Sequence, residues 1–191
     1  PGLGNWKGVL PGYPDGWTQV KQYDREVLKA NEEYGPLFAK FAAMPIVEVA
    51  QDPTALKMGG RIFASHCSVC HGSDAKGTYG FPNLTDDIWR WGGTPDEIQT
   101  TLLHGRHAVM PAWLSILGSD GTRNVAGYVL ADLAGRKLPE DAKVDLAAGK
   151  EMFAANCVAC HGPQGHGMAA MGAPDLTKPA GYIYGTSLAQ I

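Results

Sequence analysis

Hydrophobic residues recur at helical spacing along the chain, and this pattern predicts an all-α protein. Residues 24–41 carry such an apolar face, made of Val27, Ala30, Tyr34, Leu37 and Phe41. We expect this helix to break at Gly35–Pro36, because proline removes a backbone donor. The segment has to bury its apolar face, either on the domain that follows or on a partner subunit.

Two further stretches predict helices that cross each other. Leu56, Gly59 and Phe63 share one face of a short helix, and the small Gly59 allows a second helix to approach closely. We expect the crossing partner to be residues 124–138, where apolar residues again recur at helical spacing.

Between these stretches, residues 94–97 read Thr-Pro-Asp-Glu, which is typical of a helix start. Threonine is a good N-cap, proline suits the first helical position, and glutamate three residues later completes a capping box. The helix should therefore begin at Pro95, bury Ile98 and Leu102, and end by Gly105.

The chain contains an internal duplication. At an offset of 90 residues the two copies share four positions: Leu56 and Leu146, Gly59 and Gly149, Phe63 and Phe153, Gly72 and Gly162. Further on, residues 82–85 match residues 174–177 at an offset of 92, which a small loop insertion explains.

The duplication predicts the domain organisation. Residues 1–52 form an N-terminal arm, 53–138 a first domain, 139–145 a linker and 146–191 a second domain. The counterpart of Met110 in the second copy would lie beyond Ile191, so we expect the second domain to be incomplete.

Composition and charge narrow the range of functions that the chain could have. With 191 residues, 45% of them hydrophobic and 18% charged, the chain can bury a core. A net charge of -3 gives no basic field for nucleic acid. No apolar run is long enough to span a bilayer, and no signal-peptide pattern is present. Because the chain begins at Pro1, we expect a removed leader or anchor, or a fragment.

The four cysteines form two Cys-x-x-Cys pairs, and a histidine follows each pair at once. The two motifs are Cys67, Cys70 and His71, and Cys157, Cys160 and His161. In such a motif the thiols bind haem covalently and the imidazole is the proximal iron ligand. Disulfides would need no histidine, and a separation of 90 residues is long for a zinc site. The motifs therefore predict two covalently bound haem c groups.

The sixth iron ligand decides between a carrier and a catalyst, because a methionine raises the potential and closes the iron. Met110 is our candidate for the first haem, since Pro111 would present its thioether from a loop. Its alternative role is to fill core space. His104 and His107 are rival ligands, although we expect them at the surface or beside a haem propionate.

For the second haem, Met168 and Met171 follow His161 too closely to pass around the ring, so we expect its sixth ligand beyond Ile191. His66 and His166 are expected to have no haem role.

Two sets of neighbouring residues have alternative roles. Pro82 and Pro174 either orient the proximal imidazoles through their backbone carbonyls or serve as turn prolines. Three tryptophans either form a wall of the first haem site or belong to an aromatic core: Trp89, Trp91 and Trp113.

Together these features resemble the diheme subunit III, or P-subunit, of cbb3-type cytochrome c oxidases. The resemblance covers nearly the whole chain. It rests on the arm at residues 23–24 and 30–37, on both haem motifs with the glycine after each, and on His104-Gly105-Arg106 leading to Met110-Pro111.

The resemblance implies two tandem class I cytochrome c domains after a partly helical arm. It implies His/Met ligation of both irons, by His71 with Met110 and by His161 with a methionine that cannot be placed. It also implies membrane helices before the arm, absent from this chain, and a location at the periplasmic face of the bacterial inner membrane.

Electrons would then come from donor cytochromes c and pass to the monohaem cytochrome c and haem-copper subunits of the oxidase, where oxygen is reduced. The chain would not be catalytic by itself. A free-standing periplasmic diheme carrier is the alternative. A diheme peroxidase or dehydrogenase is a further alternative, and it would have an open or a His/His-ligated iron.

Overall fold

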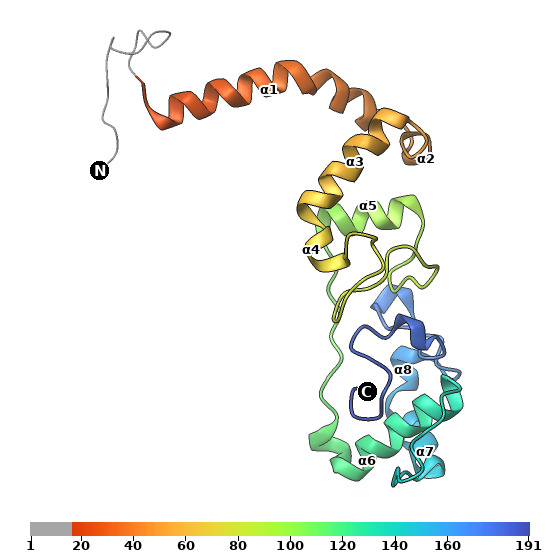
Figure 1. Ribbon diagram of the computed structural model, residues 1–191. Coiled ribbons are helices and arrows are strands. Elements are labelled where there is room, and N and C mark those ends of the chain that lie inside the picture. The colour runs from red at the N-terminus through yellow and green to blue at the C-terminus, as the bar shows by residue number, and fades with distance from the viewer. Residues whose placement is uncertain (1–16) are drawn as a thin grey trace. The chain divides into compact units, whose positions relative to one another are not determined.

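The computed structural model describes residues 17–191 (Figure 1). The chain divides into two units, Pro1–Lys57 and Met58–Ile191. The helices in chain order are α1 (Gln19–Ala42), α2 (Ile46–Val49), α3 (Pro53–His66), α4 (Ser68–His71), α5 (Pro95–His104), α6 (Leu114–Tyr128), η1 (Val129–Leu133), α7 (Leu146–Asn156), α8 (Val158–His161), η2 (Ala169–Met171) and η3 (Pro179–Gly181). Residues 17–191 contain isolated β-bridges but no strand, which confirms the all-α prediction.

In the first unit, α1 continues through Pro36, so the predicted break was wrong. Proline removes a single backbone donor, and the hydrogen bonds of the helix persist to its end, where Ala43 N–H donates to the Ala39 carbonyl. Thr18 caps the start by accepting from Lys21 N–H at 3.1 Å. Trp6 and Tyr13 of the arm lie outside the described residues.

Asp52 prepares the start of α3. Its carboxylate accepts from the N–H groups of Thr54 and Ala55 and lies 3.3 Å from Lys40 Nζ. The Ala55 N–H is the largest influence on this carboxyl, and together these contacts hold the pKa of Asp52 below its ordinary value. The residues before Pro53 thus provide the cap that its helix needs.

Helix α5 begins at Pro95 and ends at His104, followed by Gly105 with φ of 68°. Both hydrogen bonds of the capping box between Thr94 and Glu97 are present, as the sequence predicted. The predicted burial was wrong for Leu102, which is 77% exposed.

Helix α6 begins at Leu114, earlier than the sequence predicted, and kinks at Gly118, whose φ is 68°. It continues as a π-helix, η1, to Leu133. Beyond it Gly135 has φ of 61°, and Arg136 N–H donates to the Leu130 carbonyl at 2.7 Å. This hydrogen bond is typical of a helix end at a glycine in the left-handed conformation.

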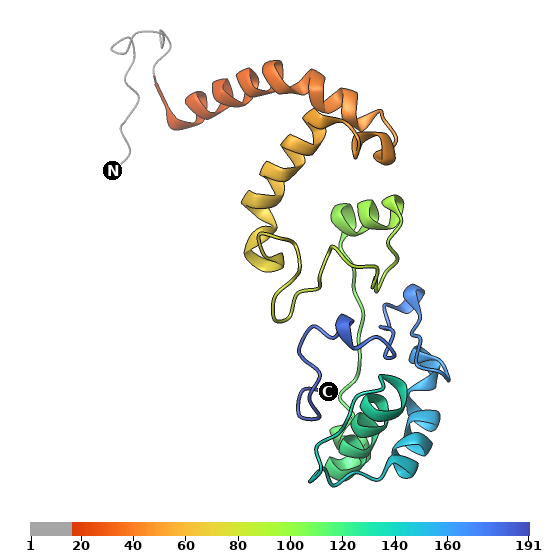
Figure 2. The same ribbon diagram turned by 45° about the vertical axis from the view of Figure 1, so that its right-hand side comes forward.

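The partner of α6 is α7, not α3, and the expected crossing at Gly59 was wrong (Figures 1 and 2). A Cβ added to Gly149 would collide with the Asn124 carbonyl, whereas one added to Gly59 would meet nothing within 4 Å. The Tyr128 and Phe153 rings lie 5.5 Å apart between centroids. Because α7 repeats the glycine and phenylalanine of α3, it offers α6 the same contact surface.

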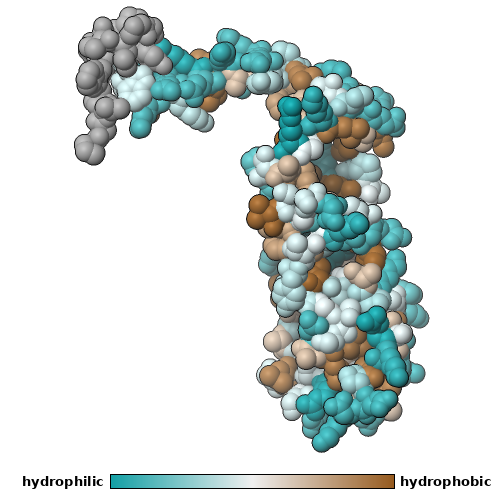
Figure 3. Space-filling model, viewed as in Figure 1, coloured by the Kyte–Doolittle hydropathy of each residue, from teal (hydrophilic) through white to brown (hydrophobic). Residues whose placement is uncertain are grey.

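The core of the described residues lies at this crossing. The buried hydrophobic residues are Ala126, Tyr128, Val129, Leu130 and Phe153. Hydrophobic residues also reach the surface of the second unit (Figure 3), among them Val69, Leu102, Leu103 and Met110. Within residues 17–191, none of the helices has the length and apolar character needed to cross a membrane.

Candidate haem sites

The first Cys-x-x-Cys-His motif forms a single helical turn directly after α3. Cys67 N–H donates to the Phe63 carbonyl at 2.9 Å, and the N–H groups of Cys70 and His71 both donate to the Cys67 carbonyl. Residues three and four positions apart on a helix face the same side. The turn therefore places the two thiols and the imidazole on one side of the backbone.

The second motif has the same backbone geometry. Cys157 N–H donates to the Phe153 carbonyl at 2.9 Å, and Cys160 and His161 both donate to the Cys157 carbonyl. The glycine after each motif has a positive φ, 81° at Gly72 and 73° at Gly162. The two copies thus share their backbone structure at the motif as well as their sequence.

No disulfide joins any of the four cysteines, which gives no support to the alternative of two disulfides. Burial, and then the neighbouring Cys160, raises the pKa of the Cys157 thiol. Within residues 17–191, no three His, Cys, Asp or Glu side chains gather as they would around a bare metal ion.

A backbone carbonyl orients each proximal histidine. His71 Nδ1 lies 3.1 Å from the Pro82 carbonyl, and His161 Nδ1 lies 3.1 Å from the Pro174 carbonyl. Because a carbonyl only accepts, Nδ1 carries the proton in this contact, and Nε2 keeps a lone pair for a metal. Of the two alternative roles of Pro82 and Pro174, these contacts confirm the orienting role.

The donor set fits haem c. Each motif supplies two free thiols for the vinyl groups and one imidazole with its Nε2 available to iron. The two sites differ in burial, since His161 is buried at 7% exposure whereas His71 is half-buried.

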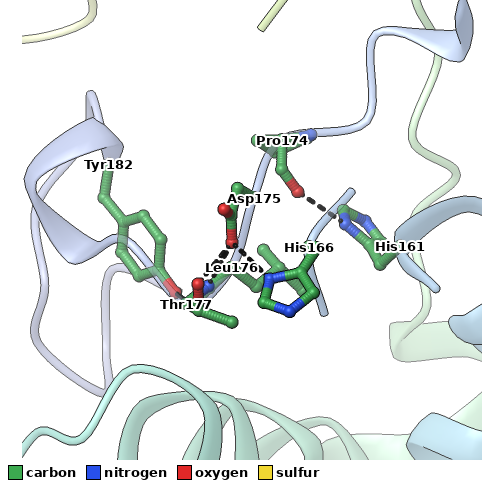
Figure 4. A network of polar contacts seen from close by, with 7 residues as sticks. All are labelled: His161, His166, Pro174, Asp175, Leu176, Thr177 and Tyr182. Carbon is green, nitrogen blue, oxygen red and sulfur yellow. Dashed lines mark hydrogen bonds and ion pairs between the residues drawn. The ribbon is translucent and has the colours of Figure 1, made fainter. Parts of the chain in front are cut away.

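A polar network supports the loop that carries Pro174 (Figure 4). The N–H and hydroxyl of Thr177 donate to Asp175 Oδ1 at 2.9 and 2.6 Å, and His166 Nδ1 lies 3.7 Å from the same oxygen. Burial of Asp175 opposes ionisation, but the Thr177 bonds and the nearby His166 and Lys178 outweigh burial and lower its pKa. His166, which we expected to be a bystander, therefore contacts this loop.

The first copy has the same loop without the charge. There Thr85 donates through its N–H and hydroxyl to Asn83 Oδ1, at 2.8 and 2.7 Å. Asn83, the equivalent of Asp175, is thus a neutral amide. The loops that carry Pro82 and Pro174 therefore share their geometry but differ in charge.

Tyr182 is a supporting residue that the sequence reasoning missed. Its hydroxyl donates to the Leu176 carbonyl at 2.5 Å, two residues after Pro174. Burial, and then the negative charge of Asp175, raises the pKa of Tyr182 to about 12. A half-buried tyrosine with a single backbone partner leaves no pattern in the sequence.

The remaining candidate ligands lie as follows. Met110 belongs to the helix-free segment 105–113 and is 71% exposed, so its ligation of the first haem stays a prediction. His104 is the last residue of α5, and His107 is exposed in the same segment.

Met168 and Met171, which we expected to be loop residues, are 42% and 49% exposed. Trp91 lies under the Arg106 guanidinium, 5.4 Å from its ring centroid. The haem-wall role of the tryptophans likewise stays a prediction.

Two protein-family models match the chain. Residues 54–129 match the family described as cytochrome c oxidase, cbb3-type, subunit III. Residues 146–189 match the cytochrome c family. The two matches cover the two copies of the duplication.

Curated proteins of similar sequence agree with these matches. The chain is 45% identical to the cbb3-type cytochrome c oxidase subunit CcoP of Rubrivivax gelatinosus, over 93% of this chain and 55% of that protein. It is 39% identical to the FixP subunit of a Bradyrhizobium species, over 99% of this chain and 71% of that protein. It is also 39% identical to FixP of Bradyrhizobium diazoefficiens, over 82% of this chain and 58% of that protein. The chain thus spans part of the length of these relatives.

Proposed function

Because this chain belongs to the CcoP/FixP family of cbb3-type cytochrome c oxidase subunits, we propose that it is the electron-entry part of such an oxidase. The chain carries two covalently bound haem c groups, one on each Cys-x-x-Cys-His motif. The observation that carries the proposal is that both motifs have one geometry, with an imidazole held by a proline carbonyl.

The residues of each site have distinct tasks. Cys67 and Cys70, and likewise Cys157 and Cys160, would hold the haem through thioether bonds, while His71 and His161 would supply an imidazole ligand to its iron. When bound, each haem supplies an iron that accepts and releases one electron. The Pro82 and Pro174 carbonyls keep the imidazoles in one orientation, which lowers the structural change that accompanies electron transfer.

Met110 completes this proposal at the first site. A thioether ligand from the segment 105–113 would close the first iron to small molecules and raise its potential. Such a closed site suits a carrier that passes electrons onward and leaves oxygen reduction to another subunit.

Membership of the family supports a proposal for the partners and the location. We infer that donor cytochromes c deliver electrons to this chain and that the monohaem cytochrome c and haem-copper subunits of the oxidase receive them. The site of action is then the periplasmic face of the bacterial inner membrane, with membrane association through a segment outside this chain.

Oxygen uptake by the oxidase complex tests this function. A complex that lacks the subunit should lose oxygen uptake with reduced cytochrome c as donor and regain it when the full-length subunit is restored. A small-molecule reductant that reaches the catalytic subunit directly should support uptake in both preparations. Undiminished uptake from cytochrome c without the subunit would contradict the proposal, and rapid carbon monoxide binding by the reduced subunit would favour a peroxidase.

A further inference from the structure

Two loops, one from each copy of the duplication, contact each other within the second unit. Gly80 N–H donates to the Ile183 carbonyl at 2.7 Å, and the Tyr79 and Tyr184 rings meet edge to face with centroids 5.5 Å apart. The Trp91 ring lies against Gly172 so closely that an added Cβ would collide with its Cζ2 atom. We call this contact the joint, made of residues 79–80, 88 and 91 with residues 172, 181 and 183–184.

The two sides of the joint are equivalent in the duplication. Gly80 corresponds to Gly172 at the offset of 92 that aligns Pro82 with Pro174. Further along the chain the offset grows by one residue to 93, and at this offset Trp91 corresponds to Tyr184. The glycine after each of these aromatic residues has a positive φ, 90° at Gly92 and 115° at Gly185, which supports the alignment.

Three close contacts across the joint follow a two-fold rule, whereas the Gly80 hydrogen bond does not, because Gly172 N–H donates to the Ala169 carbonyl within its own copy. An added Cβ at Gly80 would lie 3.3 Å from Tyr184 Cε1, just as one at Gly172 would meet Trp91. At the offset of 93, Ile88 corresponds to Gly181. These two residues contact each other, since a Cβ added to Gly181 would lie 2.7 Å from Ile88 Cγ2. When residue i meets j′ and residue j meets i′, the interface is isologous. The joint is therefore a pseudo-two-fold interface inside one chain.

The joint is directly connected to both haem sites. Gly80 lies two residues before Pro82, whose carbonyl holds His71, and Gly172 lies two residues before Pro174, whose carbonyl holds His161. The joint is therefore adjacent in sequence to both loops that position a proximal histidine.

We propose that the joint fixes the separation of the two haem sites, and that Trp91 and Gly172 are positioning residues for electron exchange between them. The inference rests on the proposed function, because exchange requires two redox-active sites. In each exchange, one site is oxidised by one electron and the other is reduced by one electron. Since electron transfer weakens steeply with distance, opening the joint slows exchange without changing the ligands of either iron.

The variant Gly172→Ala tests the joint, because its new methyl group collides with the Trp91 ring. Gly172 has φ of 66°, so alanine there also strains the backbone. Gly135→Ala is the matched control, since Gly135 has φ of 61° and open space around it.

Two readouts on the haem-loaded chain separate geometry from function. Gly172→Ala should increase the radius of gyration in X-ray solution scattering and slow inter-site electron exchange after flash photoreduction. The two midpoint potentials should stay at their wild-type values. Gly135→Ala should leave the radius of gyration and the exchange rate unchanged.

A Gly172→Ala protein with the wild-type radius and exchange rate would overturn the joint, as would equal changes in Gly135→Ala. If Gly172→Ala fails to fold, Trp91→Ala removes the opposing ring without adding an atom to the loop, and the same outcomes apply. If the wild type shows no exchange at all, the proposed function fails, and the radius of gyration still decides on the joint.

Discussion

At the scale of single residues, each haem site depends on one backbone carbonyl. The Pro82 and Pro174 carbonyls each accept a hydrogen bond from the Nδ1–H of a histidine, and this leaves the Nε2 lone pair available to the iron. The loops differ where Asn83 of the first copy becomes Asp175 in the second. A nearby negative charge favours the oxidised, more positive state of an iron centre, so this difference should separate the two potentials.

Met110→His tests the predicted ligand of the first haem. An imidazole stabilises ferric iron more than a thioether does. We therefore expect the substitution to lower the midpoint potential of the first haem in a redox titration of the holo-protein. Met168→His is the control, since we expect no ligand role for Met168, and it should leave both potentials in place. An unchanged potential in Met110→His would refute Met110 as a ligand.

Tyr182→Phe tests the support of the second proximal loop. It removes the donor to the Leu176 carbonyl and should lower the free energy of unfolding by about 1 kcal/mol near neutral pH. Because the folded pKa of Tyr182 is raised from 10.0 to about 12, the native state holds this proton more firmly than the unfolded state.

The stability that this tyrosine contributes is therefore present below pH 10 and is lost as pH rises to about 12. In urea unfolding at a series of pH values, the advantage of the wild type over Tyr182→Phe should shrink across this interval. A difference that stays constant from pH 10 to 12 would contradict the assignment.

The two Cys-x-x-Cys-His turns were recognisable in the sequence because haem attachment demands a fixed spacing of thiols and imidazole, and the ligand roles of their residues stay a prediction. The recurrence of Pro82 and Pro174 in both copies singled them out, but the sequence left open whether they orient the imidazoles or only form turns. Tyr182 was not predictable, because its role depends on burial and on the Leu176 carbonyl, which only the folded loop brings together.

At the scale of elements, the packing of α6 on α7 is the main determinant of the core. Gly149 permits the close approach of the Asn124 backbone, and Phe153, at 2% exposure, packs on Tyr128. Their equivalents Gly59 and Phe63 on α3 form a second surface of the same kind, and Gly59 has open space around it.

A matched pair of alanine variants tests this packing. Gly149→Ala forces α6 and α7 apart and should lower the free energy of unfolding by about 1–3 kcal/mol. Gly59→Ala adds a methyl group in open space and should stabilise α3 by up to about 1 kcal/mol through helix propensity. Denaturant unfolding followed by circular dichroism measures both. The opposite order of stabilities would place α6 on α3 instead.

Local signals predicted the elements better than their partners. The capping box fixed the start of α5 at Pro95, because its hydrogen bonds are made within four residues. The partner of α6 was not predictable, because a duplicated chain offers two surfaces with the same glycine and phenylalanine. The break at Pro36 was wrong because α1 tolerates the loss of one backbone hydrogen bond.

At the scale of the whole molecule, the duplication gives one chain two haem sites whose supporting loops meet at the joint. Both copies repeat the attachment turn and the orienting carbonyl. Their differences lie in burial and in the charge at Asp175. A relay needs this combination of two similar centres with unequal surroundings, since a potential difference gives electron flow its direction.

Reductive titration with a reduced donor cytochrome c measures how many electrons this chain relays. The holo-protein, kept free of oxygen, is titrated while the absorbance of its haems is followed. We predict that each chain accepts two electrons, one per site, in two separate steps. Uptake of one electron or none per chain would contradict it.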